Sequence, residues 1–115
     1  MKRGDVILVR FPHPSGIRGK KRPAVIVQSD AYSGKIRSLV VAEITGDLSM
    51  ANDPCCLFID SNSADGNATG IIKDSLVSCL LLVTVAADPS SVIATLSPKM
   101  VQQLNACLKV ALEIP

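Results

Sequence analysis

The stretch Gly16-Ile17-Arg18-Gly19-Lys20-Lys21-Arg22-Pro23-Ala24-Val25-Ile26-Val27 passes from a basic, glycine-containing loop into a short apolar run. Valine and isoleucine in so short a run, bounded by polar residues, are typical of a buried strand. Proline is tolerated at the beginning of a strand, where its missing N–H is outside the ladder. The stretch therefore predicts a charged loop over 12–21 and a strand over 24–28.

Apolar runs of the same kind recur on both sides of this stretch. We expect further strands at 6–9, 39–44, 55–59, 71–72, 76–79, 80–85 and 92–95. The segment 60–70 is rich in Asp, Asn, Ser and Gly, and we expect it to be a long surface loop. Many short strands at roughly eight- to twelve-residue spacing indicate an all-β sandwich or barrel.

The end of the chain has a different pattern. Ser97 suits a helix N-cap and Pro98 suits the first helical position. Apolar residues then follow at helical spacing from 100 to 112. The sequence therefore predicts a mainly β fold, a small β-barrel with one C-terminal α-helix packed on it. The length of 115 residues corresponds to a single domain over 1–115.

Charge is distributed unevenly along the chain. Residues 1–37 hold nine basic and two acidic residues, a local net charge of +7, whereas the whole chain carries only +2. A basic segment in a nearly neutral chain indicates either an anion-binding surface or a solvated loop. Aromatic residues make up only 3% of the sequence, so the core is expected to be aliphatic.

Several classes of function are disfavoured. His13 is the sole histidine and stands between two prolines, so we expect no metal site, and no glycine-rich nucleotide motif is present. We therefore expect no cofactor. The four cysteines show no Cys-x-x-Cys spacing and are expected to be reduced and mostly buried. No apolar run suits a secretory signal or a spanning helix, which indicates a cytoplasmic protein without a membrane partner.

Two segments offer candidate chemistry. Arg22 stands at the border between the basic loop and a strand, where a rigid guanidinium suits phosphate binding. Thr45 ends the predicted strand 39–44 and precedes Gly46, a place where a hydroxyl is held by a rigid element. An exposed arginine and a loop-capping threonine are the alternative interpretations.

The order of motifs resembles the MazF/PemK family of toxin endoribonucleases. The resemblance rests on Arg3-Gly4-Asp5-Val6, Lys21-Arg22-Pro23-Ala24-Val25-Ile26-Val27, Val41-Ala42-Glu43-Ile44-Thr45, Lys73-Asp74-Ser75-Leu76 and Leu96-Ser97-Pro98. It implies an SH3-like barrel, a homodimer and a cognate antitoxin partner. It also implies metal-independent cleavage of single-stranded RNA, in which a 2′-hydroxyl attacks the adjacent phosphate and leaves a cyclic phosphate and a 5′-hydroxyl. The family's catalytic arginine and threonine correspond to Arg22 and Thr45.

The resemblance extends to the basic loop. Phe11, His13, Ser15, Arg18, Lys20 and Lys21 are the candidate RNA-binding residues, with Phe11 either stacking on a base or packing in the core. Many members carry a glutamate where this chain has Ile17-Arg18, so the general base is open between His13 and Glu43. The alternative function is a non-catalytic barrel that binds RNA or a protein target such as gyrase.

Overall fold

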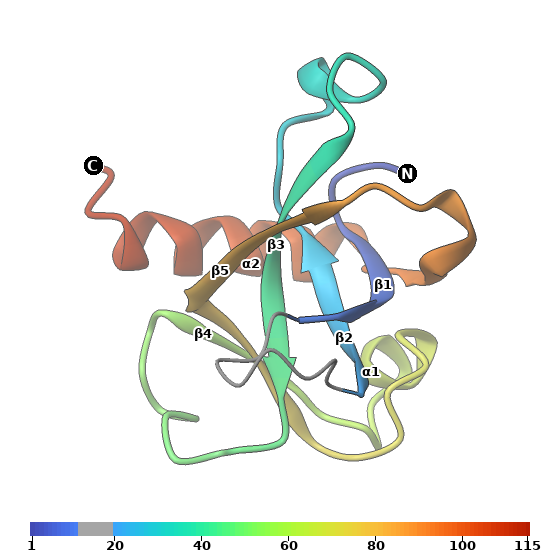
Figure 1. The fold of residues 1–115 in the computed structure, drawn as a ribbon. Helices are drawn as coiled ribbons and strands as arrows, with labels where there is room; N and C mark the ends of the chain where they lie inside the picture. The colour runs from blue at the N-terminus through green and yellow to red at the C-terminus, as the bar shows by residue number, and fades with distance from the viewer. Residues whose placement is uncertain (12–19) are drawn as a thin grey trace.

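The apolar runs form one antiparallel sheet. The computed structural model describes residues 1–11 and 20–115, and in them the strands lie in the order β4-β5-β3-β2-β1-β6 (Figure 1). The strands are β1 (Asp5–Arg10), β2 (Lys21–Ile26), β3 (Ser38–Thr45), β4 (Cys56–Ile59), β5 (Ser75–Ala86) and β6 (Val92–Thr95). The helices are α1 (Ala64–Ala68) and α2 (Pro98–Ala111), with 3-10 turns at Asp30–Tyr32 and Pro89–Ser91.

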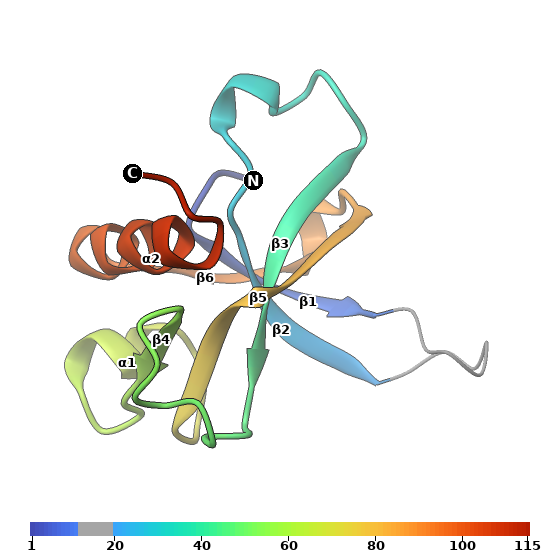
Figure 2. The same ribbon diagram turned by 90° about the vertical axis from the view of Figure 1, so that its left-hand side faces the viewer.

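Both faces of the sheet bury aliphatic side chains. On one face, α2 contributes Met100, Leu104 and Cys107 to a cluster that includes Val25 and Ile44. The other face has its own cluster, made by Ile7, Val9, Ala24, Ile26, Leu39 and Val41. Figure 2 shows α2 on one side of the curled sheet. Because successive residues of a strand point to opposite faces, each central strand serves both clusters.

The Gly4-Asp5 turn ties three strands together at the N-terminus. Gly4 has a φ of +93°, which glycine adopts without strain, and its N–H donates to the carbonyl of Ile26. The buried carboxylate of Asp5 accepts from the amide of Lys2 and from the hydroxyl of Thr95 at 2.9 and 2.8 Å. These bonds hold the start of β1 against β2 and β6.

The predicted fold class is confirmed. The protein is mainly β, and its C-terminal helix packs on the curled sheet. Ser97 caps α2 as expected, because its Oγ accepts from the amide of Met100 at 3.2 Å. None of the helices in the described part of the chain is long and apolar enough to cross a membrane.

The prediction that 60–70 is only a surface loop is wrong. The segment contains α1, whose N-cap Ser63 accepts from the amide of Gly66 at 2.9 Å. Thr69 closes the helix fully buried, and its hydroxyl donates to the carbonyl of Gly66 at 2.6 Å. The same Ser and Gly residues that suggested a loop act here as a helix cap and a close-packed position.

Two predicted strands, 76–79 and 80–85, are a single strand. β5 continues from Ser75 to Ala86, and its register with β3 shifts between the pairs Ala42↔Leu82 and Glu43↔Ser78. A bulge of this kind bends a strand without ending it. Because it interrupts the alternation of side chains between the two faces, the sequence pattern predicted two separate strands. The run 71–72 is not a strand, since it connects α1 to β5.

The second strand also begins earlier than expected. β2 starts at Lys21, which pairs with Arg10 of β1, whereas its pairing with β3 begins only at Ala24. Pro23 therefore lies inside the strand, opposite Leu8, at a position where no ladder bond to β3 is formed.

Candidate active site

Arg22, Glu43 and Thr45 lie on one face of the sheet. Ala24 of β2 pairs with Glu43 of β3, and opposite residues in an antiparallel pair share a face. Because every second residue returns to the same face, Arg22 and Thr45 share it too. Continuing the register by two residues beyond the last pair, Ala24↔Glu43, places Arg22 across from Thr45. The two predicted catalytic residues therefore project from neighbouring strands at the same end of the sheet.

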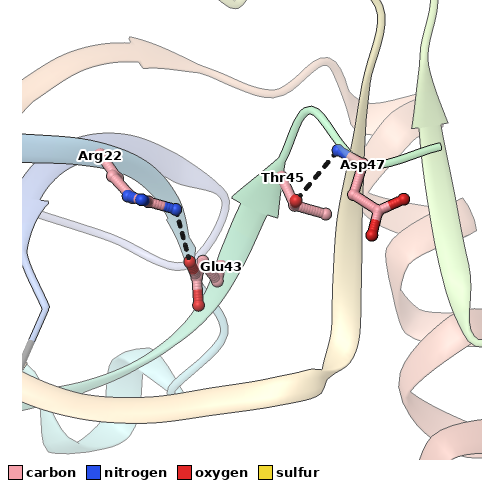
Figure 3. A network of polar contacts seen from close by, with 4 residues as sticks. All are labelled: Arg22, Glu43, Thr45 and Asp47. Atoms are coloured by element: carbon pink, nitrogen blue, oxygen red, sulfur yellow. Dashed lines mark hydrogen bonds and ion pairs between the residues drawn. The ribbon is translucent and has the colours of Figure 1, made fainter. Parts of the chain in front are cut away.

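An ion pair joins two of these side chains. Arg22 Nη1 lies 3.8 Å from Glu43 Oε1, and Figure 3 shows the guanidinium directed at the carboxylate. The Arg22 side chain is 63% exposed and the Glu43 side chain 19% exposed. A pair this open to solvent contributes little to stability, about 0–1 kcal/mol. Its consequence is geometric, because it places a carboxylate beside the candidate phosphate-binding cation.

Thr45 is held by the turn that follows β3. Its Oγ1 accepts from the amide of Asp47 at 3.1 Å (Figure 3), and Asp47 Oδ1 accepts from the amide of Ser49 at 3.0 Å. The hydrogen bonds from Ser49 lower the pKa of Asp47. A hydroxyl that accepts one bond keeps its proton for donation. The turn therefore fixes the Thr45 oxygen while leaving a donor for a substrate oxygen.

A cleft opens beside these residues. It encloses about 430 Å³ between the ends of β2 and β3 and the segment that connects α1 to β5. Arg22 and Thr45 both line it, and the remaining lining residues are Leu8, Pro23, Ile44, Gly46, Gly70, Ile71, Ile72, Lys73, Ser75 and Ile93. The structure thus places Arg22 and Thr45 along one cavity, which is the minimum that shared contact with one phosphate requires.

Lys73 is a cleft residue that the sequence reasoning did not select. Its Cε and Nζ lie 3.4 and 3.5 Å from the point where a Cβ on residue 46 would stand, so its side chain lies over Gly46. The next residue, Asp74, accepts from both the amide and the hydroxyl of Ser61, at 3.0 and 2.9 Å. The one available signal was the Lys73-Asp74-Ser75-Leu76 motif, which contributed to the family resemblance without a role for the lysine.

The other predicted RNA-binding residues divide into two groups. Lys20 and Lys21 are exposed at the start of β2. Phe11 is half-buried and packs against the cluster of Ile7 and Val9, which is the core role given above as its alternative. His13, Ser15 and Arg18 lie outside the described residues. Of the two candidate bases, the structure therefore describes the surroundings of Glu43 and not those of His13.

The cysteines are buried thiols, as expected. A hydrogen bond with Asp53 together with burial raises the pKa of Cys55 to about 12, and burial raises the pKa of Cys79 to about 12. A thiol is nucleophilic only as its thiolate, so neither suits covalent catalysis near neutral pH. In residues 1–11 and 20–115, no group of three or more His, Cys, Asp or Glu side chains is arranged to hold a metal ion.

Solved structures with the same fold span nearly the whole chain. An endoribonuclease in complex with its cognate antitoxin from a mycobacterial species is 15% identical with a TM-score of 0.72, covering 100% of this chain and 97% of that one. A MazE–MazF complex from Deinococcus radiodurans is 14% identical with a TM-score of 0.73, covering 100% and 98%. The Mycobacterium tuberculosis toxin MazF-mt6 is 17% identical with a TM-score of 0.71, covering 96% and 98%.

A comparison with curated protein sequences found no significant match. The family comparison is decisive, because the model of the PemK-like, MazF-like toxins of type II toxin–antitoxin systems matches residues 2–112. That match includes the strands that carry Arg22 and Thr45 and the helix that covers the sheet. The chain therefore belongs to the PemK-like, MazF-like family of type II toxin–antitoxin toxins.

Proposed function

We propose that the protein is an endoribonuclease that cleaves single-stranded RNA by attack of a 2′-hydroxyl on the adjacent phosphate. One observation carries the proposal: Arg22 and Thr45 line the same cleft, with Glu43 paired to Arg22, in a chain of this toxin family. Structural neighbours described as endoribonucleases support the same activity.

The chemistry assigns a role to each group. The 2′-oxygen forms a bond to phosphorus while the bond from phosphorus to the 5′-oxygen breaks, leaving a 2′,3′-cyclic phosphate and a 5′-hydroxyl. Negative charge develops on the phosphoryl oxygens, and a fixed guanidinium from Arg22 stabilises it. Thr45 donates its proton to one of those oxygens and orients the phosphate. Because the RNA supplies its own nucleophile and Arg22 supplies the positive charge, this route requires no metal ion.

Glu43 is our choice for the general base. Its carboxylate lies 3.8 Å from the Arg22 guanidinium and is on the same face of the sheet as Thr45. A carboxylate at this position is within reach of a ribose attached to a phosphate that Arg22 holds. It takes the proton from the 2′-hydroxyl, and water protonates the leaving 5′-oxygen. His13 remains the alternative base, and Arg22 itself is a poor proton carrier because a guanidinium keeps its proton.

Flanking contacts and partners complete the proposal. Lys20 and Lys21, with Arg18, His13 and Ser15, which precede them in the sequence, bind neighbouring parts of the RNA, which gives affinity without selecting a base sequence. We expect a cytoplasmic homodimer that a cognate antitoxin inhibits. The antitoxin complexes among the structural neighbours support the antitoxin partner. Light scattering that gives a monomer at micromolar concentration would contradict the dimer.

The test is cleavage of end-labelled RNA in EDTA. The wild type should produce 5′-hydroxyl ends, which a kinase labels, and cyclic phosphates, which resist phosphatase. Arg22→Ala and Thr45→Ala should abolish cleavage, whereas the matched controls Arg37→Ala and Thr84→Ala, at exposed positions that do not line the cleft, should cut normally. An inactive wild type rejects the nuclease and favours a barrel that binds RNA or a protein without cleavage. Normal cutting by both cleft variants rejects the catalytic roles of Arg22 and Thr45.

A further inference from the structure

Two buried thiols lie next to each other near the end of β3. Cys55 and Cys56 are 4% and 8% exposed, and their Sγ atoms are 3.7 Å apart. They form a small core cluster with Leu76, which is also buried. Leu76 of β5 pairs with Thr45 of β3 in the sheet. The thiols therefore share a cluster with the residue that is paired with a proposed catalytic group.

Consecutive turns give the thiols a second connection to Thr45. At one end, the amide of Asp47 donates to Thr45 Oγ1 at 3.1 Å (Figure 3). At the other end, the amide of Cys56 donates to the carbonyl of Asp53 at 3.1 Å. Three more bonds of 3.0 Å fold the residues between them: Ser49 N to Asp47 Oδ1, Ala51 N to Leu48 O, and Asp53 N to Met50 O. A displacement at Cys56 therefore has a hydrogen-bonded path to the turn that holds Thr45.

Asp53 binds both cysteines. Its Oδ1 accepts from the amide of Cys55 at 3.0 Å, and its carbonyl oxygen accepts from the amide of Cys56. The thiol of Cys55 is hydrogen-bonded to the same carboxylate. Asn52 and Pro54, on either side of Asp53, are exposed, so this turn lies at the surface of the protein. Two adjoining sulfur atoms therefore have a proton acceptor beside them and a surface turn through which a small molecule reaches them when the turn opens.

We propose that Cys55 and Cys56 form a reversible redox switch, in which a peroxide joins the two sulfur atoms as a disulfide and displaces the turn that holds Thr45. For its effect on cleavage, the inference rests on the proposed function. The Cα atoms of adjacent residues are about 3.8 Å apart, less than the roughly 4.4–6.8 Å usual in a disulfide. The ring that joins adjacent cysteines is therefore strained, and strained disulfides are readily reduced again. Such a bond suits regulation rather than permanent stabilisation of the fold.

The oxidation consumes one hydrogen peroxide and two thiols. Because Asp53 holds the proton of Cys55, the first attack falls to Cys56. Its sulfur bonds to one peroxide oxygen, the O–O bond breaks, and the products are a sulfenic acid and water. The sulfur of Cys55 then attacks the sulfur of Cys56. The S–S bond forms and the S–O bond breaks, Asp53 accepts the Cys55 proton, and the departing hydroxide takes it up as a second water. The two sulfur atoms lose two electrons, which the peroxide gains.

The disulfide changes the backbone beside Thr45. In the reduced protein, Cys56 begins β4 and the carbonyl of Cys55 accepts from the amide of Cys79 at 3.2 Å. A ring that includes the peptide between the two cysteines does not keep this extended geometry, and the close-packed cluster around Leu76 has to repack. Because a displacement of about 1 Å slows an enzyme by up to roughly a hundredfold, oxidation should slow cleavage about ten- to a hundredfold.

The bond is tested by mass spectrometry of the wild type after treatment with hydrogen peroxide. Trypsin cleaves after lysine and arginine, so both adjacent cysteines fall in peptide 38–73, whereas Cys79 falls in 74–99 and Cys107 in 100–109. Peptide 38–73 should lose two hydrogen atoms and resist alkylation, and dithiothreitol should restore both thiols. A peptide 38–73 that keeps two thiols, or that is bridged to another peptide, refutes the switch.

The consequence is tested by cleavage of labelled RNA in EDTA before oxidation, after it, and after reduction. The oxidised wild type should cut about ten- to a hundredfold more slowly and recover with dithiothreitol. Cys56→Ala should cut like the reduced wild type and should not respond to peroxide. Cys107→Ala, at a buried cysteine of α2, is the matched control and should respond as the wild type does.

A second measurement does not depend on cleavage. The backbone NMR signals of Asp47 and Ser49 should move when the wild type is oxidised and stay in place in Cys56→Ala. The signal of Tyr32, which precedes the other end of β3, should not move in either protein.

The outcomes separate the switch from the nuclease. If the reduced wild type cuts RNA and the disulfide forms without slowing it, the switch is refuted and the nuclease stands. If Cys56→Ala loses activity in peroxide as the wild type does, another oxidation is responsible and the switch is refuted. If the reduced wild type cuts no RNA but the signals of Asp47 and Ser49 move as expected, the nuclease fails and the conformational switch stands. Unmoved signals in an oxidised wild type that cuts no RNA in either state refute both.

Discussion

The substitution Glu43→Gln tests the general base directly. Glutamine preserves the shape of the side chain and its ability to accept a hydrogen bond, but it carries no charge and does not take up a proton at neutral pH. It therefore removes the proposed proton acceptor beside Arg22 without changing any residue that lines the cleft. The same change also removes the ion pair, so the structural and catalytic consequences have to be separated by their size.

The structural consequence is small. Two unit charges 3.8 Å apart in a medium with the dielectric constant of water attract each other by about 1 kcal/mol. Salt and the 63% exposure of Arg22 reduce that value further, so the free energy of unfolding should fall by less than about 1 kcal/mol. The catalytic consequence is large, because loss of a positioned general base slows a reaction roughly a hundred- to ten-thousand-fold.

The assay combines cleavage rate with stability. Single-turnover cleavage of labelled RNA in EDTA measures the chemical step, and thermal unfolding of the same samples measures the fold. Glu113→Gln, at the only other glutamate and exposed beyond α2, is the matched control and should cut at the wild-type rate. A Glu43→Gln rate within about threefold of the wild type refutes the base assignment, and a large loss in His13→Gln under those conditions would transfer the role to the histidine.

Three further predictions concern the fold that holds the site. Leu104→Ala should lower the free energy of unfolding by about 2–5 kcal/mol in urea titrations, because Leu104 is fully buried between α2 and the sheet. Gly66→Ala should lower it by about 1–3 kcal/mol, because a Cβ there would stand 1.8 Å from the carbonyl oxygen of Asp60; unchanged stability would show that α1 is packed differently. Burial raises the pKa of Cys79 from 9.0 to about 12, so the fold retains the neutral thiol and its stability should decline as pH rises from about 9 toward 12. Urea titrations at about pH 8 and about pH 10 should show a smaller decline in Cys79→Ala than in the wild type.

Local sequence patterns determined much of this fold. The β-branched runs around Val6, Val25 and Val41 predicted three central strands, and the Ser97-Pro98 pair predicted the start of α2. These features depend on neighbouring residues, through strand propensity and the capping of free N–H groups, so they can be recognised without knowing the fold. The same local signals, with the family resemblance, selected Arg22 and Thr45 as site residues.

Other features depended on contacts between distant residues. The bulge that merges 76–79 and 80–85 into β5 exists because β3 supplies a continuous partner on both sides of it. The Arg22–Glu43 ion pair follows from the register of β2 with β3, which no spacing along the chain specifies. Lys73 reaches the cleft because α1 and the Asp74–Ser61 bonds return the chain to the end of β3 beside Gly46. The sequence by itself thus determined which elements form and named two site residues. Only the tertiary structure decided that Arg22 lies beside Glu43 and that Lys73 lies beside Gly46. Strand register and the path of the segment between α1 and β5 are set by packing across the whole sheet, not by neighbouring residues in the sequence.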